Sequence, residues 1–232
     1  MTDLLIAVKI QETTSKLYLR IKDRFPDSGL LNTCQKLIDI AKESDKTLLW
    51  ISRPNYLLRS IIYSLIVFLV SVIIYSICQL NLKADGINIA DFIQMTEAGL
   101  NEIIIIGAGI AFLVTFENKK KRERVIRAIN RLRCLSHVID AHQLTKDPDT
   151  VMTISVPTVN SPKRKLNVYE LGRYLDYCSE MLSLVSKIGF LYVQNFDDPT
   201  ANNAVNDLES LTTGLCRKIW QKIIILRSMR SS

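Results

Sequence analysis

The feature that most constrains this chain is the run SIIYSLIVFLVSVIIYSIC, residues 60–78, which holds no ionisable side chain besides Tyr and Cys. As a helix these 19 residues extend roughly 28 Å, close to the thickness of the hydrocarbon core of a bilayer. Arg53 and Arg59 precede the run. Trp50 and Tyr56 lie at the same edge, where aromatic rings favour the head-group layer. The alternative is the central helix of a soluble bundle, which rarely stays apolar on every face for five turns. The run therefore predicts a membrane span.

A second uncharged run covers residues 103–116 and is followed by the basic stretch KKKRER. A span needs about 20 apolar residues, so a run of this length also suits a buried soluble helix. The preceding residues, IADFIQMTEAGLNE, are amphipathic and hold no Pro, so one helix can begin near Asn88 and continue into the basic stretch. We expect a second span, with a re-entrant or interfacial segment as the rival interpretation.

The distribution of basic residues orients the two runs. Arg53 and Arg59 flank the first run, and basic residues from Lys119 to Arg124 follow the second. The loop between the two expected spans holds one basic residue, Lys83, and three acidic ones. Lys and Arg stay cytoplasmic, so both termini are expected on the cytoplasmic side of the membrane. The predicted fold is an all-α membrane protein, a two-helix transmembrane hairpin with a cytosolic helical bundle formed by the N- and C-terminal segments. The expected domains are N-terminal cytosolic helices at 1–52, a hairpin at 53–118 with spans at about 58–80 and 98–117, and a basic cytosolic helical domain at 119–232 with a loop at 145–166.

The cytosolic helices have recognisable starts and faces. The first should carry Leu5, Val8, Leu17 and Ile21 and end at Pro26, and Asp27 or Ser28 can cap the next. After the second run, an apolar face is expected from Val125, Ile129, Leu132 and Ile139.

Two further helices should follow the loop and pack antiparallel against the juxtamembrane helix. Asn167 and Glu170 have the spacing of a capping box, and four tyrosines would give that helix an aromatic face. Asp198 as cap and Pro199 at the first helical position mark the last helix. Its expected apolar face comprises Val205, Leu208, Leu211, Leu215, Ile219 and Ile223.

The formal net charge is +7, and the excess of basic residues lies entirely after residue 116. A stripe at i, i+4, i+7 and i+11 is formed by Lys120, Arg124, Arg127 and Arg131. It suits anchoring on the anionic head groups of membrane lipids, and alternatively a phosphate track for nucleic acid. A second basic cluster, Lys163, Arg164 and Lys165, lies in the expected loop and is a candidate contact for a nucleic-acid-containing or protein partner.

The second span holds polar and small residues. Asn101 and Glu102 lie at its outer edge, and Gly107, Ala108 and Gly109 lie near its middle, where small residues let helices approach closely. Glu102 lies either at the head-group level or at the mouth of a pathway lined by an oligomer. We therefore expect a homo-oligomer that packs through this span.

Catalytic signals are sparse. Arg131 and His137 form R-x5-H, which resembles the signature of HEPN-type ribonucleases. The alternative is that His137, His142 and Asp140 make hydrogen bonds at a helix end. The histidines lack a metal-binding i, i+4 pair, the five cysteines form no CxxC cluster, and no phosphate-binding glycine loop occurs, so neither a metal nor another cofactor is expected.

The blocks HVIDAHQLTKDP, YLDYCSEMLSL and LESLTTGLCRKIWQKI resemble those of small bacterial inner-membrane proteins, and the two-span plan is similar to the two-transmembrane effectors of anti-phage systems. The resemblance implies abortive infection through loss of membrane integrity, once a sensing partner releases the effector. A membrane-tethered ribonuclease and a non-toxic membrane scaffold or adaptor are the alternative functions.

Overall fold

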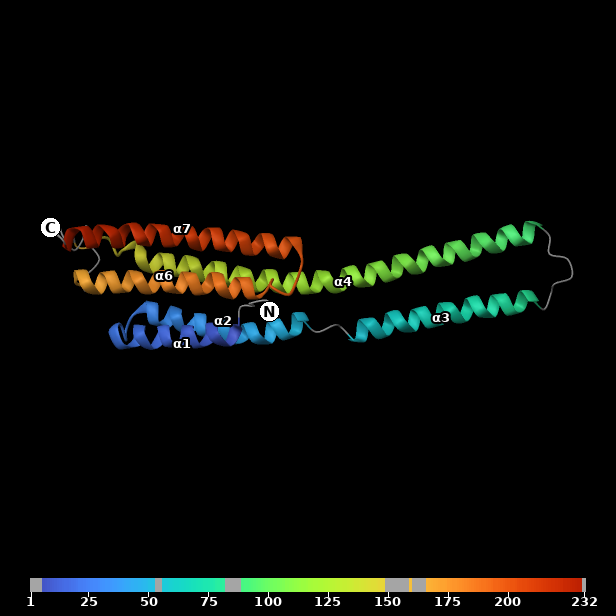
Figure 1. Ribbon diagram of the computed structural model, residues 1–232, viewed down its shortest axis with the longest axis horizontal. Helices are drawn as coiled ribbons and strands as arrows, with labels where there is room; N and C mark the ends of the chain where they lie inside the picture. Colours follow the sequence, from blue (N-terminus) through green and yellow to red (C-terminus); the bar gives the residue numbers. More distant parts are fainter. Residues whose placement is uncertain (1–5, 53–55, 82–88, 149–158, 160–165, 231–232) are drawn as a thin grey trace. The chain divides into compact units, whose positions relative to one another are not determined.

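The computed structural model describes residues 6–52, 56–81, 89–148, 159 and 166–230. Helices account for nearly all of this part of the chain, and it contains no strand (Figure 1). The all-α prediction is therefore confirmed for the described residues. In chain order the helices are α1 (Ala7–Arg24), α2 (Gly29–Ser52), α3 (Tyr56–Asn81), α4 (Ile89–Leu144), α6 (Val168–Leu191) and α7 (Pro199–Arg230).

The chain divides into two compact units. The first, here called the bundle, comprises Met1–Ser52 and Arg124–Ser232, so the N- and C-terminal segments fold together. The second, the apolar unit, comprises Arg53–Glu123 and contains α3 and the first part of α4. Helix α4 runs without interruption for 56 residues and contributes to both units, which confirms the expected single helix from near Asn88 into the basic stretch.

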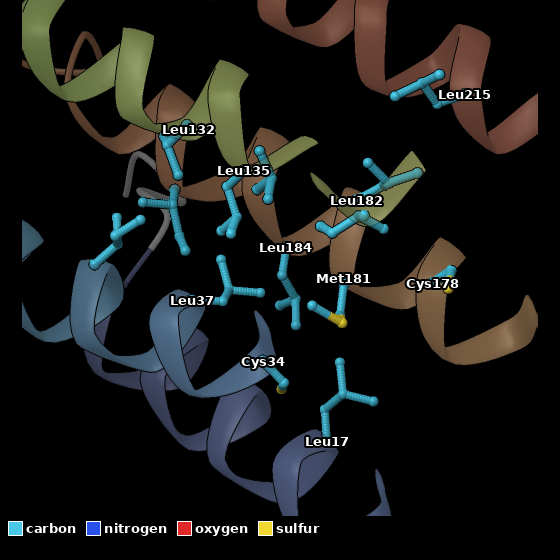
Figure 2. Packing of buried hydrophobic residues seen from close by; sticks show 14 of the residues in the cluster. Leu17, Cys34, Leu37, Leu132, Leu135, Cys178, Met181, Leu182, Leu184 and Leu215 are labelled. Carbon is cyan, nitrogen blue, oxygen red and sulfur yellow. The ribbon is translucent and has the colours of Figure 1, made fainter. Parts of the chain in front are cut away.

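The bundle has one hydrophobic core to which all five of its helical segments contribute. Figure 2 shows Leu17 of α1, Cys34 and Leu37 of α2, Leu132 of α4 and Met181 of α6 directed into a common interior. These five side chains are fully buried. Such burial removes each of them from water at a gain of about 1.5–3 kcal/mol for a large apolar side chain.

Two predicted apolar faces are buried as expected. The four residues of the face on α4, Val125, Ile129, Leu132 and Ile139, have no solvent-exposed surface. On α7 the predicted face is also buried, except that Leu211 is only partly so. Helices α6 and α7 lie side by side, and α7 is further joined to α4 by Lys222, whose Nζ donates to the carbonyl of Gln143 at 3.0 Å (Figure 1).

The helix starts depend on short side chains, as the sequence predicted. For α2, the Oγ of Ser28 accepts from the N–H of Leu31 at 3.2 Å, which selects Ser28 over Asp27 as the cap. The capping box of α6 is complete, because Asn167 accepts from the N–H of Glu170 at 2.8 Å and Glu170 accepts in return at 2.9 Å.

Helix α7 starts at Pro199, and Asp198 accepts from the N–H of Ala201 at 2.9 Å, as expected. The aromatic face predicted for α6 is partly wrong. Tyr174 and Tyr177 are buried on it, but Tyr169 is exposed and Tyr192 lies just beyond the end of the helix.

The predicted face of α1 is also partly wrong. Val8 is 54% exposed, and Leu5 lies outside the described residues. The buried face instead follows the spacing of Ile10, Thr14, Leu17 and Ile21. Thr14 fits this apolar face because its hydroxyl donates to the carbonyl of Ile10, four residues earlier, and so leaves no unpaired donor inside. Most of the predicted loop, 149–158 and 160–165, lies outside the described residues.

Gly29 and Gly214 offer a matched test of the bundle. A Cβ at Gly29, the first residue of α2, would lie 2.7 Å from Cε1 of the rigid His142 ring, whereas a Cβ at Gly214 in α7 meets nothing. We expect Gly29→Ala to lower the stability of the bundle by about 1–3 kcal/mol, as overpacking does. Gly214→Ala should raise it by up to about 1 kcal/mol, because alanine favours helix.

Thermal unfolding of the detergent-solubilised full chain, followed by circular dichroism, measures both variants. A melting temperature for Gly29→Ala equal to or above that of Gly214→Ala would contradict the tight contact with His142.

Candidate membrane segment and basic surface

Helix α3 presents large apolar side chains to its surroundings on all sides. None of its residues whose burial the structure describes is buried. At 1.5 Å per residue its 26 residues extend about 39 Å, enough to cross a bilayer with some tilt. The exposed large apolar residues of α3 are Tyr56, Leu57, Ile61, Tyr63, Ile66, Val67, Phe68, Val70, Ile74 and Tyr75.

The first part of α4 has the same character. Its exposed large apolar residues are Ile89, Phe92, Ile93, Leu100, Ile103, Ile104, Ile105, Phe112, Val114 and Phe116. By length and composition, one stretch among the described residues is long and apolar enough to cross a membrane: it begins at Gly99 in α4, and none of its most apolar window is buried. In α3 only a shorter apolar stretch, Ser60–Val72, is found by the same criteria. The two-span hairpin therefore stays a prediction.

The small residues of the predicted second span lie on exposed helix surface. Gly107 and Ala108 are exposed and Gly109 is partly so, and a Cβ at either glycine would meet nothing within 4 Å. Asn101 is also exposed. Glu102 belongs to α4, but its side chain lies outside what the structure describes.

Two of the basic residues that follow Phe116, Lys120 and Lys121, have partners within the apolar unit. Lys121 Nζ lies 2.9 Å from Glu117 Oε1, an i, i+4 ion pair. Lys120 Nζ lies 4.8 Å from the centroid of the Phe116 ring, so this ammonium rests on an aromatic face. Both contacts lie within α4.

In the bundle, the predicted basic stripe is divided by what each residue contacts. The guanidinium of Arg124 lies over the ring of Trp50, 4.5 Å from its centroid. Arg131 Nη1 is instead 2.7 Å from Glu43 Oε2 on α2, in an exposed ion pair. Arg127, between them, is exposed. The stripe is therefore not a uniform row of unpaired cations.

The second predicted basic cluster, Lys163, Arg164 and Lys165, lies outside the described residues. Its role as a contact for a partner stays a prediction.

Arg131 and His137 are six residues apart on α4, which turns their side chains about 120° from each other around the helix axis. Both are exposed, and Arg131 is engaged by Glu43. The helix alone does not bring them to one point. Asp140 accepts from Gln143 Nε2 at 2.6 Å, a hydrogen bond near the end of the helix as expected.

His142 makes an interhelical contact that the sequence did not reveal. Its Nε2 lies 2.8 Å from the hydroxyl of Thr33 on α2, and that hydroxyl also lies 2.9 Å from the carbonyl of Gly29. Both contacts are satisfied when Thr33 donates to Gly29 and accepts from an Nε2–H of neutral His142. Burial, reinforced by Lys146 and Lys36, lowers the pKa of His142 from its ordinary value of 6.5.

A surface cluster between α1 and α6 was also not predicted. The guanidinium groups of Arg20 and Arg173 lie 5.8 and 5.2 Å from the ring centroid of Tyr177, and Arg20 pairs with Glu180. Arg173 is bound in addition to Asp176 at 3.1 Å. Two carboxylates thus balance the charge of the two guanidinium groups, so the cluster is a set of contacts between α1 and α6 rather than an open anion site. Its only sequence signal was the row of tyrosines on α6.

The cysteines that the structure describes are free thiols. Burial raises the pKa of Cys34 and of Cys178 to about 12, so both stay protonated and unreactive at neutral pH. Among the described residues, no group of three or more His, Cys, Asp or Glu side chains is arranged to hold a metal ion.

Comparisons of the chain with protein-family models, with curated proteins and with solved structures found no match.

The stability of the bundle should fall as the pH is lowered through the titration of His142. Its pKa is lower in the folded chain than in the unfolded one, so below pH 6.5 the unfolded chain binds the additional proton. The loss begins near pH 6.5 and is complete below the folded pKa. We expect the melting temperature to fall between pH 7.5 and pH 5, and to fall less in His142→Gln.

The exposed His137 provides the matched control. His137→Gln should keep the pH dependence of the wild-type melting temperature. An equal flattening in both variants would contradict the assignment of the effect to His142.

Proposed function

We propose that the chain is a membrane-embedded toxic effector of bacterial anti-phage defence. It oligomerises and perturbs the inner membrane when a sensing partner releases or triggers it. The proposal rests on one observation above all. In the apolar unit, α3 exposes large apolar side chains from Tyr56 to Tyr75 and α4 does so from Ile89 to Phe116, and the bundle keeps its own core buried.

The physical cost of that exposure in water supports a bilayer as the environment. Fully burying a Leu, Ile, Val or Phe side chain gains about 1.5–3 kcal/mol, and seventeen such residues are exposed on the described parts of the two helices, so each forgoes part of this gain in water. Soluble monomers rarely expose contiguous apolar patches beyond a few hundred Å². An assembly of copies in lipid covers these faces without a large soluble partner.

The open glycines of α4 support assembly within the membrane. Around Gly107 and Gly109 the helix surface is unobstructed, so a second helix can approach the backbone closely. The bundle, with its separate core, supplies a folded body on which a sensing partner can act. A non-toxic membrane scaffold has the same membrane segment and differs in the effect on the bilayer.

Membrane potential in bacteria after induced expression tests the proposal. We expect rapid depolarisation by the wild type and by Ile106→Leu, which keeps the apolar surface of α4. Ile106→Arg should abolish it, because an arginine at the centre of a span costs about 2.5–3.5 kcal/mol on insertion scales. Ser183→Arg, which adds the same charge to an exposed position of α6, should depolarise like the wild type.

Resistance to alkaline extraction tests membrane insertion, and its combination with the membrane potential separates the two candidate functions. A wild-type chain that resists extraction without depolarising the cell would favour the scaffold. A chain that is extracted at high pH would contradict membrane insertion itself.

A further inference from the structure

The contact between Arg124 and Trp50 joins two segments that the chain separates by more than seventy residues. The guanidinium carbon lies 4.5 Å from the ring centroid, so the cation sits on the face of the indole. Trp50 remains 39% exposed and Arg124 is exposed, so both can reach a ligand from solvent. Stacking holds the planar guanidinium in place and leaves its N–H groups free to donate sideways.

Exposed basic residues lie near this pair on both helices. One helical turn from Arg124 on α4 stands Arg127, and one turn from Trp50 on α2 stands Lys46; both are exposed. By contrast, Glu43 places a carboxylate beside Arg131, so a phosphate that approaches Arg131 meets negative charge. Attraction for an anion is therefore concentrated at the Arg124 end of the stripe.

The place of the pair along the chain identifies the anion. Trp50 lies six residues before the start of α3 at Tyr56, and Arg124 lies eight residues after Phe116, about 12 Å along α4. An indole with one polar edge and an arginine that donates to phosphate are the side chains suited to the head-group layer. A nucleic-acid track would instead need cations that remain available along the whole stripe, including at Arg131.

We infer that Arg124, held on the ring of Trp50, forms a binding site for the head group of an anionic phospholipid. The inference rests on the proposed membrane insertion and adds to it a lipid class and a site. The phosphate accepts hydrogen bonds from the Arg124 guanidinium, with Lys46 and Arg127 contributing positive charge. The apolar edge of Trp50 contacts the start of the acyl chains.

Trp50 can report on its own site. The chain has two tryptophans, and Trp220 lies exposed on α7, so Trp220→Phe leaves Trp50 as the only tryptophan, which can be excited apart from the tyrosines. We would reconstitute this full-length variant in nanodiscs and compare quenching by brominated phosphatidylglycerol with quenching by brominated phosphatidylcholine at equal mole fraction. Preferential quenching by the anionic lipid is expected.

Two charge-neutralising variants decide whether the preference belongs to the site. Arg124→Gln should lower the apparent affinity for the anionic lipid roughly five-fold, the effect of one basic residue near a charged surface. Arg217→Gln removes the same charge from an exposed position of α7 and should leave the preference intact. Equal losses in the two variants would overturn the site in favour of a general attraction of the cationic bundle.

The remaining outcomes are also distinguishable. Equal quenching by the two lipids would overturn the head-group site while membrane insertion stands. Absence of quenching by either lipid would overturn both. An oligouridylate RNA is added to nanodiscs of phosphatidylcholine alone. One outcome is that the RNA alters the Trp50 fluorescence of Trp220→Phe but not that of the same chain with Arg124→Gln added. If the anionic lipid shows no preferential quenching in that case, the ligand is a nucleic acid.

Discussion

The structure depends on a change in the surface of the single helix α4, from uncharged in its apolar part to amphipathic in the bundle. From Ile103 to Phe116, α4 carries no charged side chain, and from Val125 onward it carries one apolar stripe that is completely buried. The helical backbone continues without a break from the first surface to the second. A segment that is apolar all round needs an apolar environment, whereas an amphipathic one needs a partner helix on one side. The part of α4 from Val125 onward packs in the helical bundle, and a bilayer is the environment proposed for the apolar part before it.

Local signals made much of the bundle predictable. Ser28, Asn167 and Asp198 each precede a helix and satisfy backbone N–H groups that the helix leaves free. The stripe from Val125 to Ile139 and the one on α7 follow the helical period, so their burial follows from spacing alone. The face of α1 was harder, because its buried side includes Thr14, whose hydroxyl is satisfied by its own helix. Counting only apolar residues assigned Val8 to that face in error.

The candidate site was less predictable because its contacts join helices that are distant in the sequence. The basic stripe could be read from its spacing, but its division between Trp50 and Glu43 required the packing of α2 against α4. The contact of His142 with Thr33 and the contacts of Arg20 and Arg173 with Tyr177 likewise depend on how the helices pack. No local pattern specifies which of several exposed arginines meets which partner. Only the relative placement of the helices does so.

The division of the stripe bears on what the basic surface does. An exposed ion pair such as that of Arg131 with Glu43 contributes about 0–1 kcal/mol to stability, so its main effect is on the local field rather than on the fold. It cancels positive charge at the end of the stripe farther along α4 from Phe116. Arg124 keeps its charge and gains a rigid aromatic support in Trp50. Binding of a long polyanion would not benefit from positive charge that is kept at Arg124 and cancelled at Arg131. Contact with the charged layer of a membrane at the Arg124 end would benefit from it.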